Sequence, residues 1–336
     1  MPLLLQDPIA TKRTSNLPTN LNTSARELID RQVVPNLSRL RIEDRSSRDK
    51  GCILDFGCQV PGGLEAGLLL AKICMADLAN VQIVPADQGI WHGPMLQVTT
   101  DDPVAACMAS QYAGWKVAQG KFFAMGSGPM RSKRKREEVL EHLGLNEESH
   151  CAVGVLECDE IPSSDIIELV ANECGVSIEQ TTLCVAPTRS IAGVIQVVAR
   201  SIETAMHKLH ELGFDLHKVV SAHGTAPIPP MAKDFAEAIG RTNDAILYGG
   251  QVTLWVDGSD EDIESIGAKV PSIASKDFGK PFAKTFREYQ YDFYKVDPGL
   301  FAPAMVTFVN LRTGNSFRYG KLFPEILRDS FACKDA

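Results

Sequence analysis

Segments with two different periodicities alternate along almost the whole chain, and this alternation constrains the fold more than any other feature of the sequence. Short segments such as 51–57, 151–157 and 181–187 are rich in apolar and β-branched residues and read as strands. Between such strands lie segments with a period near 3.6, including 164–175 and the longest one, 191–213. The alternation predicts a mixed α/β (α+β) fold and excludes all-α and all-β folds.

Two further segments give more specific expectations. Residues 102–118 are expected to form one helix, because Pro103 fits the first helical position behind an acidic cap. Residues 304–320 are expected to form a β-hairpin whose turn contains the sequence TGN. The C-terminal part of the chain should therefore end in two antiparallel strands.

The length of the chain bears on its domain organisation. A chain of 336 residues corresponds to about two domains or one large domain. The polar, glycine-containing segment 126–135 is a candidate hinge, which gives an N-terminal α/β part over 1–130 and a C-terminal α/β part over 131–336. The alternative is a discontinuous domain that recruits the C-terminal hairpin.

Charge and cysteine usage indicate the class of protein and its compartment. The chain has 34 Lys+Arg against 42 Asp+Glu, a formal charge of −8, which argues against a nucleic-acid partner. No run approaches the ~20 apolar residues of a membrane-spanning helix, and the opening MPLLLQDPIATKR lacks the apolar core of an export signal. Nine cysteines without a C-x-x-C pair fit a reducing compartment. We therefore expect a cytoplasmic protein without membrane contact.

A basic run, RSKRKR, covers residues 131–136. It stands alone and leads into Glu137 and Glu138, so the expected structure is a solvated helix start. Binding of a phosphate-bearing ligand is the alternative. The preceding MGSGPM contains neither G-x-G-x-x-G nor G-K-[ST], so a nucleotide-binding fold is not indicated.

Two sets of residues could indicate hydrolytic chemistry. Glu203, His207 and His210 are spaced so that they could place metal ligands on adjacent helical turns, but no H-E-x-x-H motif accompanies them. Ser221 lies close to His223, but the chain has no G-x-S-x-G motif, so this stretch is expected to be a loop that lines a ligand. A metal-dependent hydrolase stays open and a serine hydrolase is disfavoured.

The polar face of segment 191–213 contains the most informative pair. At 100° per residue, Arg200, Glu203 and His207 lie opposite the apolar stripe of the helix. Arg200 and Glu203 are therefore neighbours, either as an exposed ion pair or as a cleft-lining pair in which the arginine orients a catalytic carboxylate. Periodicity alone does not decide between the two.

Seven segments together resemble the methenyltetrahydromethanopterin cyclohydrolase family, whose enzymes open the methenyl bridge of a one-carbon-carrying pterin. They occur in one order over most of the chain, which makes the resemblance more specific than a short motif. The segments are DFGCQVPGGLEAG (55–67), YAGWKV (112–117), FFAMGSGP (122–129), CVAPTRSIAGVIQVVARSIETAMHKL (184–209), HGTAPIPP (223–230), NDAILYGGQVTLWV (243–256) and DFYKVDPGLFAPAMVTFVNLRTG (292–314). The resemblance implies two α/β domains with a pocket between them, a homotrimer and a role in formaldehyde oxidation.

The resemblance also assigns chemical roles. Arg200 and Glu203 match the catalytic Arg-x-x-Glu pair of the family, which implies that Glu203 takes a proton from the attacking water while Arg200 holds the carboxylate. The methenyl carbon lies between two nitrogens that share a positive charge, so no metal and no cofactor besides the pterin substrate are expected. Candidate substrate-binding residues are Trp115, Lys116, Phe123, Ser221, His223 and Thr225. For Trp115, Lys116 and Phe123, core packing or simple solvation is an equal alternative.

Two other functional classes remain open at this point. One is a metal-dependent hydrolase that uses Glu203, His207 and His210, and the other is a non-catalytic protein that binds a pterin or a phosphate. Metal analysis separates the first class from the cyclohydrolase, and turnover separates the second.

Overall fold

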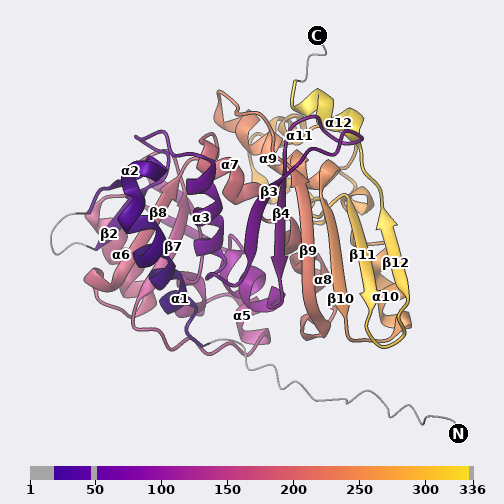
Figure 1. Ribbon diagram of the computed structural model, residues 1–336, viewed down its shortest axis with the longest axis horizontal. Helices are drawn as coiled ribbons and strands as arrows, with labels where there is room; N and C mark the ends of the chain where they lie inside the picture. Colours follow the sequence, from indigo (N-terminus) through magenta and orange to yellow (C-terminus); the bar gives the residue numbers. More distant parts are fainter. Residues whose placement is uncertain (1–18, 47–50, 333–336) are drawn as a thin grey trace, which may run out of the picture.

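The computed structural model describes residues 19–46 and 51–332, which form two six-stranded sheets side by side (Figure 1). The opening run MPLLLQDPIATKR and Cys333 lie outside the described residues. Sheet 1 has the order β1 (Glu43–Asp44), β2 (Cys52–Asp55), β8 (Thr181–Ala186), β7 (Ala152–Glu157), β6 (Phe122–Ser127) and β5 (Trp115–Gln119). Sheet 2 has the order β12 (Ser316–Gly320), β11 (Met305–Asn310), β10 (Gln251–Val256), β9 (Val219–Pro227), β4 (Met95–Thr100) and β3 (Asn80–Val84).

Both sheets are mixed, which confirms the expected α/β (α+β) fold. In sheet 1, β2, β8 and β7 run parallel, whereas β1, β6 and β5 are antiparallel to their neighbours. In sheet 2, β10 and β11 are parallel and every other pair is antiparallel. The expected C-terminal hairpin is confirmed as β11 and β12.

The two sheets are built from interleaved parts of the chain. Sheet 1 takes β1, β2, β5 and β6 from before residue 130, and β7 and β8 from after it. Sheet 2 joins β3 and β4 to strands that begin more than 100 residues later. The sheets therefore do not follow a division of the chain into 1–130 and 131–336.

Helices cover sheet 1 on both faces and sheet 2 on one. The helices are α1 (Leu21–Leu28), α2 (Leu37–Leu40), α3 (Leu64–Cys74), α4 (Met130–Arg134), α5 (Glu138–His142), α6 (Ser164–Cys174), α7 (Ile191–Val198), α8 (Ser201–Glu211), α9 (Phe235–Gly249), α10 (Asp260–Gly267), α11 (Phe282–Glu288) and α12 (Pro324–Ser330). One core joins α1 and α3 to sheet 1, and another joins α6 to its opposite face. The largest core lies between sheet 2 and helices that include α7, α8 and α9.

Helices α3 and α7 pack closely between the two sheets (Figure 1). A Cβ atom on Gly67 of α3 would lie 2.6 Å from the Cβ of Ile195 in α7, so only glycine permits this approach. Residues of both helices contribute to the same large core, which continues to sheet 2. The start of α8, which follows α7, is thereby held between the two halves of the molecule.

The expectation of one continuous helix over 191–213 is wrong. Helix α7 ends at Val198 and α8 begins at Ser201, with Ala199 and Arg200 between them. The carbonyl oxygen of Ala199 accepts a hydrogen bond from Nε2 of Gln111 at 3.1 Å. Because this bond comes from a residue 88 positions earlier, the apolar periodicity of the segment gives no sign of the break.

The expectation of one helix over 102–118 is also wrong in its second half. The described structure has a π-helix, η3 (Val104–Gln111), followed by strand β5. In β5 the side chains of Trp115 and Val117 are buried and that of Lys116 is exposed, which is the period-two pattern of a strand. Pairing of β5 with β6, the next strand along the chain, satisfies the backbone hydrogen bonds of β5 and overrides its helical composition.

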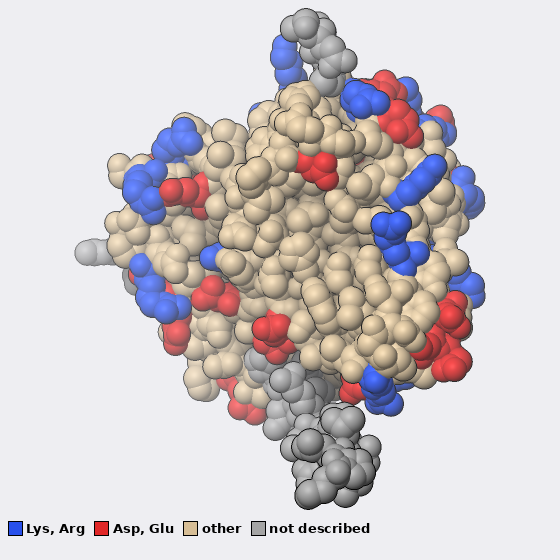
Figure 2. Space-filling view, turned by 45° about the vertical axis from the view of Figure 1, so that its right-hand side comes forward, with Lys and Arg blue, Asp and Glu red and all other residues tan. Residues whose placement is uncertain are grey.

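The outer face of sheet 2 is open and almost uncharged. In β9, β10 and β11 the buried residues alternate with half-buried ones, as expected when one face packs on the core and the other does not. The outward side chains are Asn80, Gln82, Gln97, Thr99, Ser221, His223, Thr225, Gln251, Thr253, Trp255, Met305, Thr307, Val309, Ser316 and Arg318. Figure 2 turns this side of the molecule forward and shows charged side chains gathered mainly toward the rim.

A membrane-spanning helix requires both length and high hydropathy. None of the helices in the described residues combines the length and the apolar character needed to cross a bilayer.

Candidate active site

The break between α7 and α8 carries the two residues that the sequence singled out. Arg200 precedes the first turn of α8, and Glu203 lies within that turn. Their exposed fractions are 8% and 5%, so both residues are buried. An exposed ion pair, one of the two alternatives left open by periodicity, is therefore excluded.

The guanidinium group of Arg200 contacts two other elements. Its Nη1 donates to the carbonyl oxygen of Gln111 at 2.6 Å, and its Nη2 donates to Oγ of Ser127 at 3.1 Å. Gln111 ends the π-helix η3 and Ser127 ends β6. Among the described residues no carboxylate lies within ion-pair distance of this guanidinium. Arg200 is thus fixed by neutral acceptors, and its positive charge remains available to nearby groups.

The carboxylate of Glu203 is buried without a fixed partner. In residues 19–46 and 51–332 no side chain or backbone group forms a hydrogen bond or ion pair with it. Burial raises the pKa of Glu203, and the positive charges of Arg200, His207 and Arg131 oppose that rise. A carboxylate in this state can accept a proton from a water or a ligand, because no group of the protein occupies its oxygen atoms.

Arg131 is a second buried cation near Glu203, and its burial corrects the expectation for the basic run. The run was expected to be a solvated helix start, but the side chain of Arg131 is fully buried and pairs with Glu137. Its Nη1 also donates to the carbonyl oxygens of Met108 at 3.1 Å and Ser110 at 3.2 Å. These partners come from η3 and from the residues after α4, so the sequence pattern could not reveal them.

The aromatic ring of Tyr112 connects Arg131 to α8. The Tyr112 and His207 rings stack with centroids 4.7 Å apart and an interplanar angle of 17°. Cζ of Arg131 lies 4.8 Å from the centroid of the same tyrosine ring. Burial lowers the pKa of His207, while the negative charge of Glu203 raises it. Tyr112, Arg131, Arg200, Glu203 and His207 thus form one cluster.

Three of the predicted substrate-binding residues lie on sheet 1. Trp115 is buried under Cζ of Arg134, 4.3 Å from its ring centroid, and belongs to the core of that sheet. Phe123 is 55% exposed. Nζ of Lys116 lies 3.8 Å from the ring centroid of Tyr294, which lies between β10 and β11 of sheet 2 in the sequence. Of these three residues, only Phe123 and Lys116 have exposed side chains.

The other three predicted residues lie on β9 and are separated from Glu203 by sheet 2. A Cβ on Gly224 would meet Oγ of Ser201 at 2.5 Å, so this glycine faces α8. Because side chains alternate along a strand, His223 and Thr225 face the opposite side, as does Ser221, whose Oγ donates to Asp101 at 2.7 Å. The structure does not bring these three residues together with Glu203.

Sequence reasoning missed four members of the site: Gln111, Tyr112, Ser127 and Arg131. Tyr112 lies within YAGWKV and Ser127 within FFAMGSGP, two segments that carried the family resemblance. Arg131 lies in the basic run. For Tyr112 and Ser127 these segments were the available signal, whereas neither periodicity nor spacing places Gln111 or Arg131 beside α8.

The metal-site alternative finds no assembled ligand set. In the part of the chain that the structure describes, no group of three or more His, Cys, Asp or Glu side chains is arranged to hold a metal ion. The ring of His210 lies 5.8 Å from that of His142, whereas His207 stacks on Tyr112. His207 and His210 thus have different neighbours.

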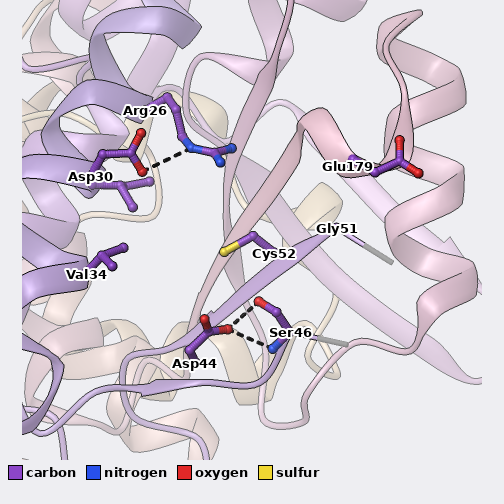
Figure 3. Close-up of a pocket in the computed structure, with 9 residues that line it drawn as sticks. Arg26, Asp30, Val34, Asp44, Ser46, Gly51, Cys52 and Glu179 are labelled. Carbon is purple, nitrogen blue, oxygen red and sulfur yellow. Dashed lines mark hydrogen bonds and ion pairs between the residues drawn. The ribbon is translucent and has the colours of Figure 1, made fainter. Parts of the chain in front are cut away.

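A cavity of about 340 Å³ lies at the edge of sheet 1 (Figure 3). Its lining includes Arg26 and Asp30, whose Nε and Oδ1 atoms are 3.3 Å apart, together with Asp44, Cys52 and Glu179. None of the residues predicted for the active site lines it. This cavity is distinct from the cluster around Glu203.

Comparison with known proteins identifies the family. The model of the family described as "Cyclohydrolase (MCH)" matches residues 20–331. A methenyltetrahydromethanopterin cyclohydrolase of Rhodopirellula baltica is 52% identical over 284 residues, covering 83% of this chain and 85% of the relative. Enzymes of the same name from Methylobacillus flagellatus and Methanococcoides burtonii are 44% and 43% identical, covering 90% and 88% of this chain and 92% and 93% of the relatives. The chain therefore belongs to the methenyltetrahydromethanopterin cyclohydrolase family.

Proposed function

We propose that the chain hydrolyses the methenyl bridge of 5,10-methenyltetrahydromethanopterin to 5-formyltetrahydromethanopterin, with Glu203 as the general base. The observation that carries this proposal is the buried Glu203 carboxylate, which has two arginines nearby and no fixed hydrogen-bonding partner. The family resemblance supports placing the reaction in one-carbon metabolism, in the oxidation of formaldehyde.

The chemistry requires a base more than an electrophilic catalyst. The methenyl carbon already carries positive charge through its two nitrogens, so attack is limited by the supply of a deprotonated water. A carboxylate within about 3 Å of that water can remove its proton as the C–O bond forms. Burial raises the pKa of Glu203, which makes the carboxylate a stronger base once it is ionised.

Arg200 prevents burial from leaving Glu203 permanently protonated. Its positive charge lowers the pKa of Glu203 against the larger effect of burial. Because Gln111 and Ser127 fix the guanidinium group, its charge stays in place while the carboxylate gains and loses a proton. His207, when protonated, and Arg131 make weaker contributions of the same sign.

For the substrate rings we propose contacts on the sheet 1 side. The exposed ring of Phe123 can pack on an apolar ring of the pterin, and Lys116 can meet a polar edge if it leaves the ring of Tyr294. Buried Trp115 supports this region from within the core. For Ser221, His223 and Thr225 the position on the outer face of sheet 2 favours a role other than contact with the reacting carbon.

The first prediction concerns Glu203→Gln. Glutamine keeps the shape of the side chain but cannot accept the proton of water, so kcat should fall about 10²–10⁴-fold, equivalent to roughly 3–5 kcal/mol of barrier. Substrate binding should change much less. Loss of the methenyl absorbance gives the rate, and circular dichroism shows whether the variant is folded.

Arg200→Ala is the matched variant for the arginine. It should also slow turnover, and the double variant should be little worse than the slower single variant, because residues that act as one unit are not additive. Wild-type turnover in folded Glu203→Gln protein would remove Glu203 from the mechanism.

We also propose that the reaction needs no metal and no cofactor, since the substrate supplies its own positive charge. Dialysis of the protein against a strong chelator should leave kcat unchanged. If activity disappears and returns with zinc or iron, the enzyme is a metal-dependent hydrolase and the role given to Glu203 is wrong. If the protein binds the pterin without turnover, it is a binding protein.

The assembly proposed for this chain is a homotrimer, as the family resemblance implies. The nearly uncharged outer face of sheet 2 supports self-association, because copies of a chain with a net charge of −8 can meet there without repulsion between like charges. Light scattering at micromolar concentration should therefore give about three times 36.6 kDa. A mass near 36.6 kDa would refute the trimer.

A further inference from the structure

The proposed hydrolysis releases a proton that has to leave a buried site, and the inference below rests on that proposed function. The oxygen of water forms a bond to the methenyl carbon, and a C–N bond breaks with its electron pair staying on the departing nitrogen. That nitrogen takes one of the two water protons. Because the cationic substrate becomes a neutral formyl product, the second proton is released in every turnover. If Glu203 accepts it, Glu203 has to be deprotonated again before the next cycle.

Helix α8 carries three titratable side chains in a row that leads away from Glu203. Glu203, His207 and Glu211 are spaced four residues apart, so they lie one above the other on the same helix face. Nε2 of His207 lies 4.0 Å from Oε1 of Glu211. Glu203 is 5% exposed, whereas the side chains of His207 and Glu211 are 22% and 32% exposed. The row therefore runs from the buried site toward solvent.

The imidazole of His207 is held in place by a different part of the chain. Tyr112, the residue that follows the π-helix η3, stacks on the imidazole with ring centroids 4.7 Å apart. The charged and titratable groups around His207 are Glu203, Glu211, His210, Lys208, Arg131 and Tyr112, and those around Glu211 are His207, Lys208, Asp297 and His210. The stack limits rotation of the ring, so its Nε2 stays directed along the helix toward Glu211.

We propose that Glu203, His207 and Glu211 form the path by which the proton of each turnover leaves the active site. Neighbours at this spacing have Cβ atoms about 5–6 Å apart, a distance that one bridging water can close. His207 accepts the proton from the Glu203 carboxyl group on one ring nitrogen and gives up a proton from the other. Glu211 receives it and passes it to solvent, which leaves neutral His207 in its other tautomer. Exchange of the ring protons with solvent at the part-exposed imidazole restores the starting tautomer before the next turnover.

The protonation equilibria of the three groups fit such a path. Burial raises the pKa values of Glu203 and Glu211, whereas burial lowers the pKa of His207. These directions shift the acidities of the carboxylic acids and the imidazole toward each other. Such shifts favour transfer of a proton between the two kinds of group.

His207→Phe tests the path, because phenylalanine keeps an aromatic ring against Tyr112 but carries no proton. With methenyl substrate we expect kcat to fall about 10- to 100-fold, at or below the lower end of the range for loss of an acid–base group, with KM nearly unchanged. Added imidazole buffer at constant ionic strength should restore much of kcat in the variant and leave the wild type unaffected. Glu211→Gln should show a smaller loss with the same response to buffer.

His210→Phe is the matched control, since it removes the same group from the same helix but away from the row. Its kcat should stay close to that of the wild type. A wild-type kcat in His207→Phe, or a loss of kcat that imidazole buffer does not relieve, would overturn the path and leave His207 as a packing residue. The variant His207→Gln repeats the test with a smaller side chain. Absence of turnover in the wild type would instead contradict the proposed function itself.

Discussion

Burial of the Glu203 carboxylate without a hydrogen-bonding partner is the constraint on which the rest of the site depends. A carboxylate removed from water is costly unless positive charge lies nearby or its pKa rises. In this molecule both occur, because Arg200 and Arg131 oppose the rise that burial causes. The two arginines are themselves buried, so they in turn require acceptors.

The C-terminal end of the π-helix η3 supplies most of these acceptors. The carbonyl oxygens of Met108 and Ser110 bind Arg131, and that of Gln111 binds Arg200. The end of a helix carries partial negative charge and free carbonyl groups, which suits two cations. A π-helix has a wider turn than an α-helix and often marks functional sites. In this chain η3 contacts both Arg200, at the break before α8, and Arg131, in α4.

The sequence predicted the parts of the fold that depend on local pattern. The strands over 151–157 and 181–187 and the C-terminal hairpin are confirmed, because apolar composition and turn residues are local properties. The break at Arg200 was not predictable, since its causes lie in Gln111 and Ser127, far away in the chain. For the site, periodicity placed Arg200, Glu203 and His207 on one face but left their burial open. The burial of Arg131 depends on tertiary contacts with η3 that no motif reports.

The most direct test of this account is the dependence of kcat on pH. Glu203 acts as a base only when ionised, so activity is lost as pH falls through its pKa. Because burial raises that pKa above the ordinary 4.5, the acid limb of the profile should have an apparent pKa above 4.5, and it should be absent from the residual activity of Glu203→Gln. An acid limb at or below 4.5, or one that the variant retains unchanged, would contradict the central role of the buried carboxylate.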